Sequence, residues 1–459
     1  MKRKKQTTSE GHIEIVNGDL ESHPQCPHGP TILFSRNVKG TKRNFFACAA
    51  SRDRKHCNFF LWAENRSSFK KDVWQQEINK ELEGINHEKL FSVQEMMKVP
   101  PAMRLFCHKC TELVDEREDD QHKNHDSIRK LTDYQLKHPT EILPALENTK
   151  KEAQYLFSKS SVQTMMDMFE RLGYRHIICI GTPRIHEHLQ NHCSNFTSIL
   201  LDMDKRFHSF FGPHQYCWYN MFNHHFFFEE ARDVFRNFLH TNNGKNIMLV
   251  TDPPFGGRTE LIANTLNTIN EEYEELNDVR TDLPMFWIYP YFMEPQIRNS
   301  MPEFRMLDFK VEYENHAMFH NGLKGRKQGS PVRIFTNVDL RSIKLPDDDY
   351  KYCDECDKWV AIENKHCAAC NDCTSKSGVT YVHCTRCSRC VKPTWQHCGK
   401  CGRCTQKDHL CEQLVFHKEC YNCKEPGHKK ADCPKNSEVG AKKMLNQPNL
   451  KPKKKKKKH

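Results

Sequence analysis

The tetrapeptide Asp252-Pro253-Pro254-Phe255 groups residue types that can hold an aromatic amine. It follows the apolar run 247–250, and because two prolines cannot donate to a β-ladder, the pattern predicts a buried strand that ends here. The carboxylate and a proline carbonyl are hydrogen-bond acceptors, and the phenyl ring offers a face for stacking. The alternative is a simple turn at a strand end, and the neighbouring motifs must decide between the two.

An exocyclic amine on an aromatic ring is a poor nucleophile, because its lone pair is delocalised into the ring. Hydrogen bonds from the amine to the Asp252 carboxylate and to the carbonyl of Pro253 or Pro254 would favour a pyramidal nitrogen aimed at an electrophile. Phe255 would stack on the base, and most of the acceleration would come from positioning. Because a base must leave its stack to reach such a site, single-stranded or bulged nucleic acid is favoured.

The elements that must position this site lie between about 152 and 337. There, short apolar runs alternate with stretches of helical length, which predicts a mostly parallel, doubly wound α/β sheet. The expected strands are 175–180, 197–201, 215–221, 245–250, 286–289, 306–313 and 332–335, and the clearest helices are 161–172 and 259–275. Open sheets of this kind bind ligands at the carboxyl ends of their strands.

Three other strand ends carry residues suited to a nucleotide-type ligand. Gly181 and Thr182 form a turn after the first strand, where a ligand can meet the backbone. Asp202 or Asp204 follows the second strand, from which a carboxylate can hold ribose hydroxyls, although an exposed turn is the alternative. The third strand ends at 220–223, in an aromatic-rich stretch that could equally be core.

A glycine turn, an acid and D-P-P-F after strands one, two and four resemble an S-adenosylmethionine-dependent amino-methyltransferase, in the order of the rRNA and DNA adenine enzymes. The resemblance implies a Rossmann-like class I methyltransferase sheet of seven strands and a catalytic role for the tetrapeptide. It also implies cofactor binding by Gln154, Tyr155, Phe157, Gly181, Thr182, Asp202, Met221, Phe222, Asn223 and Asp252. One departure is that Gly181 stands alone where the family has a glycine-rich loop.

The 23 cysteines lie mostly in CxxC and HC pairs interleaved with histidine, a pattern that indicates zinc rather than disulfides. The first set is Cys26, His28, Cys48 and Cys57, and with the closing F-F-x-W it resembles a GRF-type zinc finger, a module that binds single-stranded nucleic acid. Its phenylalanines could equally form the core of a small domain. Cys107, Cys110, His122 and His125 resemble a C2H2-type site, with a structural clip favoured over base reading.

The last third of the chain repeats the unit H-C-x2-C-x2-C three times after an opening CxxC pair, so it predicts three or four zinc ions. The ligands are Cys353, Cys356, His366, Cys367, Cys370, Cys373, His383, Cys384, Cys387, Cys390, His397, Cys398, Cys401, Cys404 and Cys411, the last with His409 or His417. The opening resembles the cysteine-rich part of a DHHC domain. A palmitoyltransferase is excluded, because no membrane-spanning segment flanks the array and no D-H-H-C occurs. A scaffolding role is expected.

Cys420, Cys423, His428 and Cys433 form a C-x2-C-x4-H-x4-C zinc knuckle, which grips unpaired bases and most often RNA. The zinc total is then six or seven ions.

The chain has 459 residues, only 37% of them apolar, and a net charge of +11 that favours a polyanionic partner or nuclear import. The expected organisation is a basic disordered tail (1–20), GRF finger (21–66), helical segment with the C2H2-like site (67–135), methyltransferase domain (136–345), cysteine-rich array (350–418), knuckle (419–435) and basic disordered tail (436–459).

This ordered set of modules resembles the CCHC-zinc-finger rRNA adenine methyltransferase family over almost the whole chain. The resemblance implies N6-methylation of an adenosine in large-subunit (28S-type) rRNA. The adenosine is expected to lie in a hairpin or to be unpaired. The resemblance also implies a nucleolar location. We expect a monomer in the nucleus and nucleolus, with the cytoplasm as a further location, and no membrane association. Two rivals are a non-catalytic RNA-binding zinc protein with a decayed methyltransferase fold and a DNA adenine methyltransferase.

Overall fold

The structure is a computed structural model that describes residues 13–16, 18–38, 41–50, 57–83, 87, 93–146, 154–315, 330–376 and 379–411. The chain forms two compact units. The first runs to His366 and includes 376–379, and the second holds 367–375 and the chain from Thr380 onwards. Among the described residues, no helix is long and apolar enough to cross a membrane.

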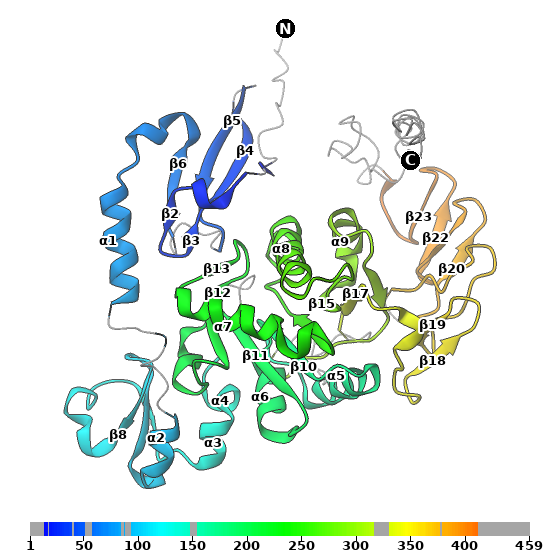
Figure 1. Ribbon diagram of the computed structural model, residues 1–459. Coiled ribbons are helices and arrows are strands. Elements are labelled where there is room, and N and C mark those ends of the chain that lie inside the picture. Colours follow the sequence, from blue (N-terminus) through cyan, green and yellow to red (C-terminus); the bar gives the residue numbers. More distant parts are fainter. Residues whose placement is uncertain are drawn as a thin grey trace, which may run out of the picture. The chain divides into compact units, whose positions relative to one another are not determined.

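A twisted eight-stranded sheet is the centre of the first unit (Figure 1), in the order β13-β12-β11-β10-β14-β15-β17-β16. The strands from β12 to β15 in this order are parallel, and the pairs β13–β12, β15–β17 and β17–β16 are antiparallel. Their bounds are β10 (His176–Ile180), β11 (Thr197–Asp202), β12 (Tyr216–Asn220), β13 (His225–Phe226), β14 (Ile247–Thr251), β15 (Met285–Pro290), β16 (Arg305–Leu307) and β17 (Val332–Thr336). The seven predicted strands are therefore present, although β16 is shorter than predicted and β13 is additional.

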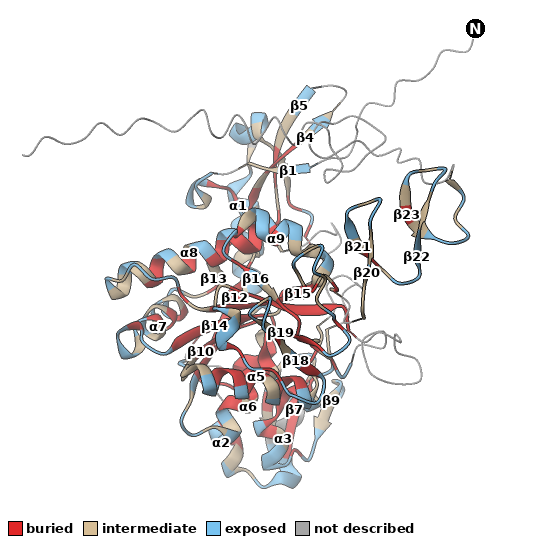
Figure 2. Cartoon of the chain, turned by 90° about the vertical axis from the view of Figure 1, so that its right-hand side faces the viewer, coloured by how far each residue is buried: buried red, intermediate tan, exposed pale blue. Residues whose placement is uncertain are grey.

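Both faces of the sheet are buried, as the apolar runs predict (Figure 2). Along β10, Ile177 packs into one core cluster and Ile178 into the other. The helices α5 (Lys159–Leu172) and α6 (Pro183–His192) contribute to the first cluster, and α7 (Glu229–Leu239) and α8 (Thr259–Asn277) contribute to the second. The sheet is thus doubly wound, and its helices leave the carboxyl edge of the strands available for a site.

The chain before the sheet forms two small β-modules. The first is a sheet of β1 (Ile13–Ile15), β4 (Ile32–Val38), β5 (Thr41–Ala47) and β6 (Phe60–Trp62), with the hairpin β2 (Gln25–Cys26) and β3 (Gly29–Pro30) beside it. β1 lies in the segment predicted as a disordered tail, and it is ordered because it pairs antiparallel with β4. Phe45, Phe46 and Phe59 are buried, so these rings form the core of the module.

The predicted helical segment begins with α1 (Lys71–Leu82) and α2 (Val93–Lys98). A three-stranded sheet follows, in the order β8-β7-β9. Its strands and the next two helices are β7 (Arg104–Cys107), β8 (Glu112–Asp115), β9 (Ser127–Arg129), α3 (Asp133–Lys137) and α4 (Pro139–Ile142), and α9 (Glu294–Ser300) follows β15. Short 3-10 helices are η1 (Leu20–Ser22), η2 (Ala63–Ser68), η3 (Pro101–Met103), η4 (Glu116–Gln121), η5 (Lys205–Ser209), η6 (Thr241–Gly244), η7 (Tyr291–Met293) and η8 (Leu340–Ser342).

The cysteine-rich array is a series of two-stranded hairpins. β18 (Tyr350–Cys353) pairs with β19 (Lys358–Ala361), and this hairpin belongs to the first unit. The second unit contains the hairpin of β20 (Val382–Cys384) with β21 (Arg389–Val391) and that of β22 (Trp395–Cys398) with β23 (Arg403–Gln406). The predicted knuckle lies outside the described residues.

Candidate active site and metal centres

A cavity of about 1300 Å³ lies at the carboxyl ends of the parallel strands. Ile180 is paired with Leu201 on one side and with Thr251 on the other, so the strands β10, β11 and β14 end level with one another. The cavity is lined by Asp202, the last residue of β11, and by Gly181 and Asp252, which follow β10 and β14. The sheet therefore brings together the three strand-end motifs that were recognised separately in the sequence.

Asp252 is held at the cavity by its backbone and by one tyrosine. Its amide donates to the Ile180 carbonyl (3.2 Å), and the Tyr313 hydroxyl donates to its Oδ1 atom (3.0 Å). Burial raises the pKa of Asp252 well above its usual value, and the hydrogen bond from Tyr313 opposes this rise by favouring the ionised form. No described residue donates to Oδ2, so this oxygen can accept a hydrogen bond from a ligand.

The two prolines have different roles. The Pro254 carbonyl accepts from the Gly257 amide (2.7 Å) and closes the turn, whereas no described residue donates to the Pro253 carbonyl. The sequence left open which proline carbonyl accepts a hydrogen bond from the amine, and the structure favours that of Pro253. The next residue, Phe255, packs its ring edge-on against Tyr289 at 5.8 Å between centroids, and Tyr155 lies at 6.0 Å. The Phe255 ring is therefore fixed by an aromatic surround, as a stacking platform requires.

Tyr313 is the site residue that the sequence interpretation missed. It is fully buried and forms an isolated bridge with Phe157. Residues 154–158 pair with 312–315: the Ser158 amide donates to the Glu312 carbonyl (2.8 Å) and the Glu314 amide to the Leu156 carbonyl (2.9 Å). The pairing holds Gln154 and Tyr155 at the cavity and Tyr313 against Asp252. The only available signal was that Tyr313 ends the predicted strand 306–313.

The first turn explains why a single glycine suffices. Gly181 has φ +64°, and a Cβ atom placed on it would lie 3.2 Å from the Asp252 carbonyl oxygen. Both the left-handed backbone and the close approach of β10 to β14 therefore favour glycine here. Because the constraint falls on one position, the missing glycines of the family loop do not show a decayed fold.

Asp202 and Asp204 are distinguished by their partners. The Asp204 carboxylate is buried and ion-paired to Arg206, with Oδ2 at 2.7 Å from Nη2 and Oδ1 at 2.8 Å from Nε. The Asp202 carboxylate accepts hydrogen bonds from backbone amides, that of Asp204 at 2.8 Å, and both acids line the cavity. Burial, and then the Asp204 charge, raises the pKa of Asp202 to about 7. Of the two carboxylates on the cavity wall, that of Asp204 is therefore ion-paired, and that of Asp202 has no ion pair with a described residue.

The other predicted cofactor residues fall into two groups. Gln154, Tyr155, Met221 and Phe222 line the cavity together with Gly181, Asp202 and Asp252. Phe157, Thr182 and Asn223 are buried and are not among the described lining residues. Phe157 stacks on Tyr313 at 5.2 Å, and the Asn223 side chain donates to the carbonyls of His28 (3.0 Å) and Pro30 (2.8 Å). These contacts support the cavity wall from behind.

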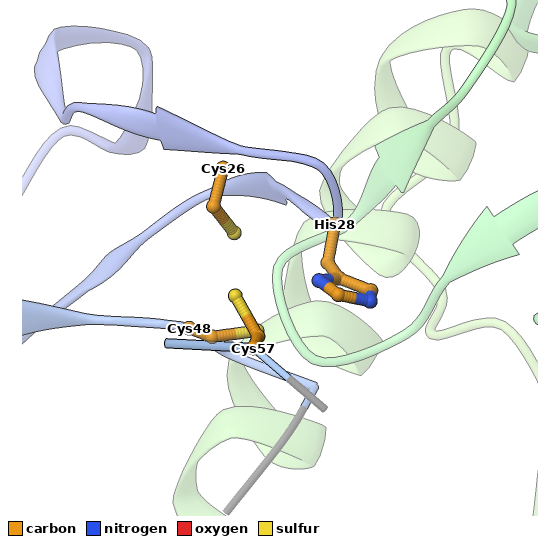
Figure 3. A group of neighbouring side chains, drawn as sticks. All are labelled: Cys26, His28, Cys48 and Cys57. Carbon is orange, nitrogen blue, oxygen red and sulfur yellow. The ribbon is translucent and has the colours of Figure 1, made fainter. Parts of the chain in front are cut away.

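The N-terminal metal centre gathers the four ligands that the spacing predicted (Figure 3). His28 lies on the turn between β2 and β3 and faces the thiols of Cys26, Cys48 and Cys57, with all four ligand atoms within 4.8 Å of one another. Three thiolates and one imidazole are a donor set that zinc prefers, so these residues fit the ion. The Asn220 side chain at the end of β12 donates to the His28 carbonyl (2.7 Å), which ties the metal turn to the cavity.

Cys107, Cys110, His122 and His125 also converge. The Cys107 and Cys110 sulfurs both lie 3.5 Å from Nδ1 of His125. The site joins the β7–β8 hairpin to the loop before β9, and no recognition helix carries its histidines. The Ser209 hydroxyl donates to the Thr111 carbonyl in this hairpin (2.8 Å), which attaches the module to the segment that follows β11 of the central sheet. The arrangement agrees with a structural clip.

The array uses its ligands in an interleaved order. Each CxxC pair meets the histidine of the following repeat: Cys356 lies 3.2 Å from His366, Cys370 lies 3.2 Å from His383, and Cys387 lies 3.2 Å from His397. The third cysteine also comes from that following repeat, since the sulfurs of Cys370 and Cys390 are 3.7 Å apart and those of Cys387 and Cys404 are 3.6 Å apart. A tetrahedral ion with Zn–S bonds of about 2.3 Å separates two sulfurs by about 3.8 Å, so the sets fit zinc.

The members of each set are as follows: Cys353 and Cys356 with His366; Cys367, Cys370, His383 and Cys390; Cys384, Cys387, His397 and Cys404; Cys398, Cys401, His409 and Cys411. Cys373 is buried. In the last set, the His409 imidazole lies 3.3 Å from the Cys411 sulfur. His409 therefore fills the position that the sequence left open between His409 and His417, and His417 lies outside the described residues.

Comparison with known proteins agrees with the geometry. Residues 148–339 match a family described as probable N6-adenine methyltransferase, 24–66 match the GRF zinc finger, and 418–435 match the zinc knuckle. The chain is 44% identical over 425 residues to the human rRNA N(6)-adenosine-methyltransferase ZCCHC4, which covers 90% of this chain and 82% of the relative. The relative of the same name from Xenopus tropicalis is 41% identical, over 91% of this chain and 88% of the relative. That from Mus musculus is 40% identical, over 77% of this chain and 72% of the relative. The chain therefore belongs to the family of rRNA N6-adenosine-methyltransferases that bears the name ZCCHC4.

Proposed function

We propose that this protein transfers a methyl group from S-adenosylmethionine to N6 of an unpaired adenosine in large-subunit rRNA. The observation that carries the proposal is that Asp252, Pro253 and Phe255 line one cavity, while no described residue donates to the Asp252 Oδ2 atom or to the Pro253 carbonyl. The names of the relatives supply the rRNA substrate, and the GRF finger and knuckle support RNA binding. A monomeric state and a nucleolar location are part of the proposal.

The residues on the first three strand ends would hold the cofactor, which supplies an electrophilic methyl group when bound. Asp202 would accept the ribose hydroxyls, and Met221 and Phe222 would flank the cofactor adenine from the end of β12. The Gly181 backbone leaves room beside Asp252 because it carries no side chain. Each of these residues lies on the wall of the same cavity as D-P-P-F, so the methyl donor and the amine can meet there.

The chemistry at the amine follows from the free acceptors. Asp252 Oδ2 and the Pro253 carbonyl would each accept one N–H bond of the amine, which directs the nitrogen lone pair away from both. Phe255 would stack on the target base, and its ring is held by Tyr155 and Tyr289. The amine must lose one proton for the product to be neutral, and Asp252 Oδ2 is the nearest acceptor. Positioning supplies most of the rate enhancement.

Tyr313→Phe is expected to lower the methyl-transfer rate at neutral pH on the order of tenfold, because a hydrogen bond to the Asp252 carboxylate is lost. Burial already raises the pKa of Asp252, and the loss of the Tyr313 donor raises it further. Since the ionised carboxylate is the active form, the acidic limb of the rate profile should move to higher pH. Single-turnover rates measured between about pH 5 and pH 9 test this.

Tyr289→Phe is the matched control, because its hydroxyl donates to the carbonyls of Phe255 (3.2 Å) and Gly257 (3.0 Å) and not to the carboxylate. It should leave the acidic limb in place. If Tyr313→Phe loses rate equally at every pH, Tyr313 only packs against its neighbours and does not set the charge of Asp252.

Mass spectrometry of nucleosides tests the function directly. RNA and DNA are incubated separately with the protein and with S-adenosylmethionine that carries a labelled methyl group, and each is digested to nucleosides. We expect label in N6-methyladenosine from rRNA and none from double-stranded DNA. Label in DNA alone would assign the protein to the DNA adenine methyltransferases, and no label in either would favour an RNA-binding protein without catalysis.

A further inference from the structure

The two hairpins of the second unit repeat one sequence pattern at an interval of 14 residues. The pattern is aromatic-x-His-Cys-x-basic-Cys-x-Arg-Cys, and it spans 381–390 and 395–404. It places Arg386 and Arg389 in the first hairpin, and Lys400 and Arg403 at the same positions in the second. The zinc ligands account for the cysteines and histidines of the repeat, but the repeated cations and aromatic residues are not ligands.

The fold places the repeated residues at equivalent positions. Arg389 pairs with Cys384 across the β20–β21 hairpin, and Arg403 pairs with Cys398 across β22–β23. The turn between the two cysteine positions is also the same, since Ser388 (φ 47°) and Gly402 (φ 65°) both take the left-handed conformation. Each hairpin therefore presents its two cations from the same places on the same frame.

The metal sites do not need these cations. In the preceding repeat, Ala369 and Asp372 stand at the positions of Arg386 and Arg389. That repeat still supplies the CxxC pair of a complete site, and its Asn371 takes the same left-handed turn (φ 49°). A requirement of zinc binding thus does not explain why the two later hairpins are basic.

The cations and one large ring face solvent. Arg386, Arg389 and Lys400 are exposed, and none of them is ion-paired to an acid among the described residues. Trp395 is 37% exposed although it stands at the start of β22 (Figure 2, where these hairpins carry exposed and intermediate residues). From Thr380 to Cys411 the chain has six Lys and Arg residues and one acidic residue, Asp408. An exposed indole and unpaired cations on the same pair of hairpins are the combination that holds single-stranded nucleic acid, through stacking and phosphate contacts.

We infer that the β20–β23 hairpins form a binding surface for single-stranded RNA. Arg386, Arg389 and Lys400 contact phosphates, and Trp395 stacks on a base. An acidic protein would satisfy the charges but would leave the indole without a planar partner, so RNA is the better match. The inference rests on the proposed function for its RNA substrate, and it assigns to the array a role in RNA affinity beyond scaffolding.

Binding of the full-length, zinc-loaded protein to a single-stranded 20-nucleotide RNA tests this surface. The double variant Arg386→Gln/Lys400→Gln should bind on the order of tenfold more weakly at physiological salt. Its plot of log affinity against log salt should be less steep by about 1.4, because two phosphate contacts at about 0.7 each are lost. Arg171→Gln/Lys245→Gln is the matched control: both residues are exposed and outside the array, and the charge change is identical.

Zinc content and cross-linking complete the test. The double variant should retain the zinc of the wild-type protein, and ultraviolet cross-linking of the wild-type protein should join RNA to peptides that contain Trp395. The inference would be overturned if the double and control variants bound RNA with equal affinity, whether or not the double variant kept its zinc. It would also be overturned if no cross-link fell within 380–411. If wild-type protein binds this RNA but transfers no methyl group, the proposed function fails and the surface stands. If it methylates RNA while the double variant binds normally, only the surface fails.

Discussion

Replacing Asp252 by asparagine is expected to lower the rate of methyl transfer by about a thousandfold. Asparagine keeps the shape of the side chain and a carbonyl acceptor, but it cannot carry the negative charge that offsets the positive charge developing on the amine. It also cannot accept the proton. The Tyr313 hydroxyl, 3.0 Å from Oδ1, would still hold the side chain in place, so the loss should fall on the chemical step.

Single-turnover kinetics with saturating RNA and cofactor measure this effect, and equilibrium binding of both ligands should change by less than about threefold. Asp278→Asn is the matched control, because it makes the same chemical change at an exposed residue that ends α8 in a left-handed conformation suited to asparagine. A variant at Asp252 that keeps a tenth of the wild-type rate would show that the carboxylate charge is not needed.

Removal of the GRF-type zinc ion is expected to unfold the first β-module and to abolish activity. Structural zinc contributes about 10–16 kcal/mol in small modules, which exceeds the stability that so small a core can supply. Asn220 and Asn223 donate to the carbonyls of His28 and Pro30, so the loss of the metal turn also frees two side chains beside the cavity. Cys57→Ser should therefore weaken RNA binding as well as lower the melting temperature.

Metal analysis by mass spectrometry supplies the count. The wild-type chain should hold seven zinc ions, six from the groups among the described residues and one from the knuckle, and Cys57→Ser should hold one fewer. Cys193→Ser is the control, since this cysteine belongs to none of the ligand sets and should leave seven. A Cys57→Ser protein that keeps its full zinc content and activity would exclude the assigned site.

Seven strands and the helices α5 and α8 of the methyltransferase domain were predictable because each is a separate run with a clear apolar pattern. The order of the sheet was not, because placing β17 between β15 and β16 depends on contacts between residues far apart in the chain. The tail prediction for 1–20 was wrong at β1 for the same reason, since Ile13–Ile15 is ordered only by its pairing with β4.

The site shows the same limit. D-P-P-F, Gly181 and Asp202 were found from the sequence because each follows a strand of the same sheet edge. Tyr313 was not found, because it lies 61 residues from Asp252 and reaches it only through the pairing of 154–158 with 312–315. Spacing also identified the zinc ligands of the array, but it did not show which ligands share an ion. The repeating unit H-C-x2-C-x2-C does not bind one ion by itself, because each ion takes ligands from two successive repeats.

The interleaving of ligands in the second unit has a consequence for how it matures. His383, with Cys390, serves one ion while the adjoining Cys384, with Cys387, serves the next, so occupancy of either site orders the strand that carries ligands for the other. The hairpins therefore behave as a row of coupled neighbours, in which filling one position favours filling the next. Uptake of metal along the row should be cooperative, and damage to one repeat should spread to two ions.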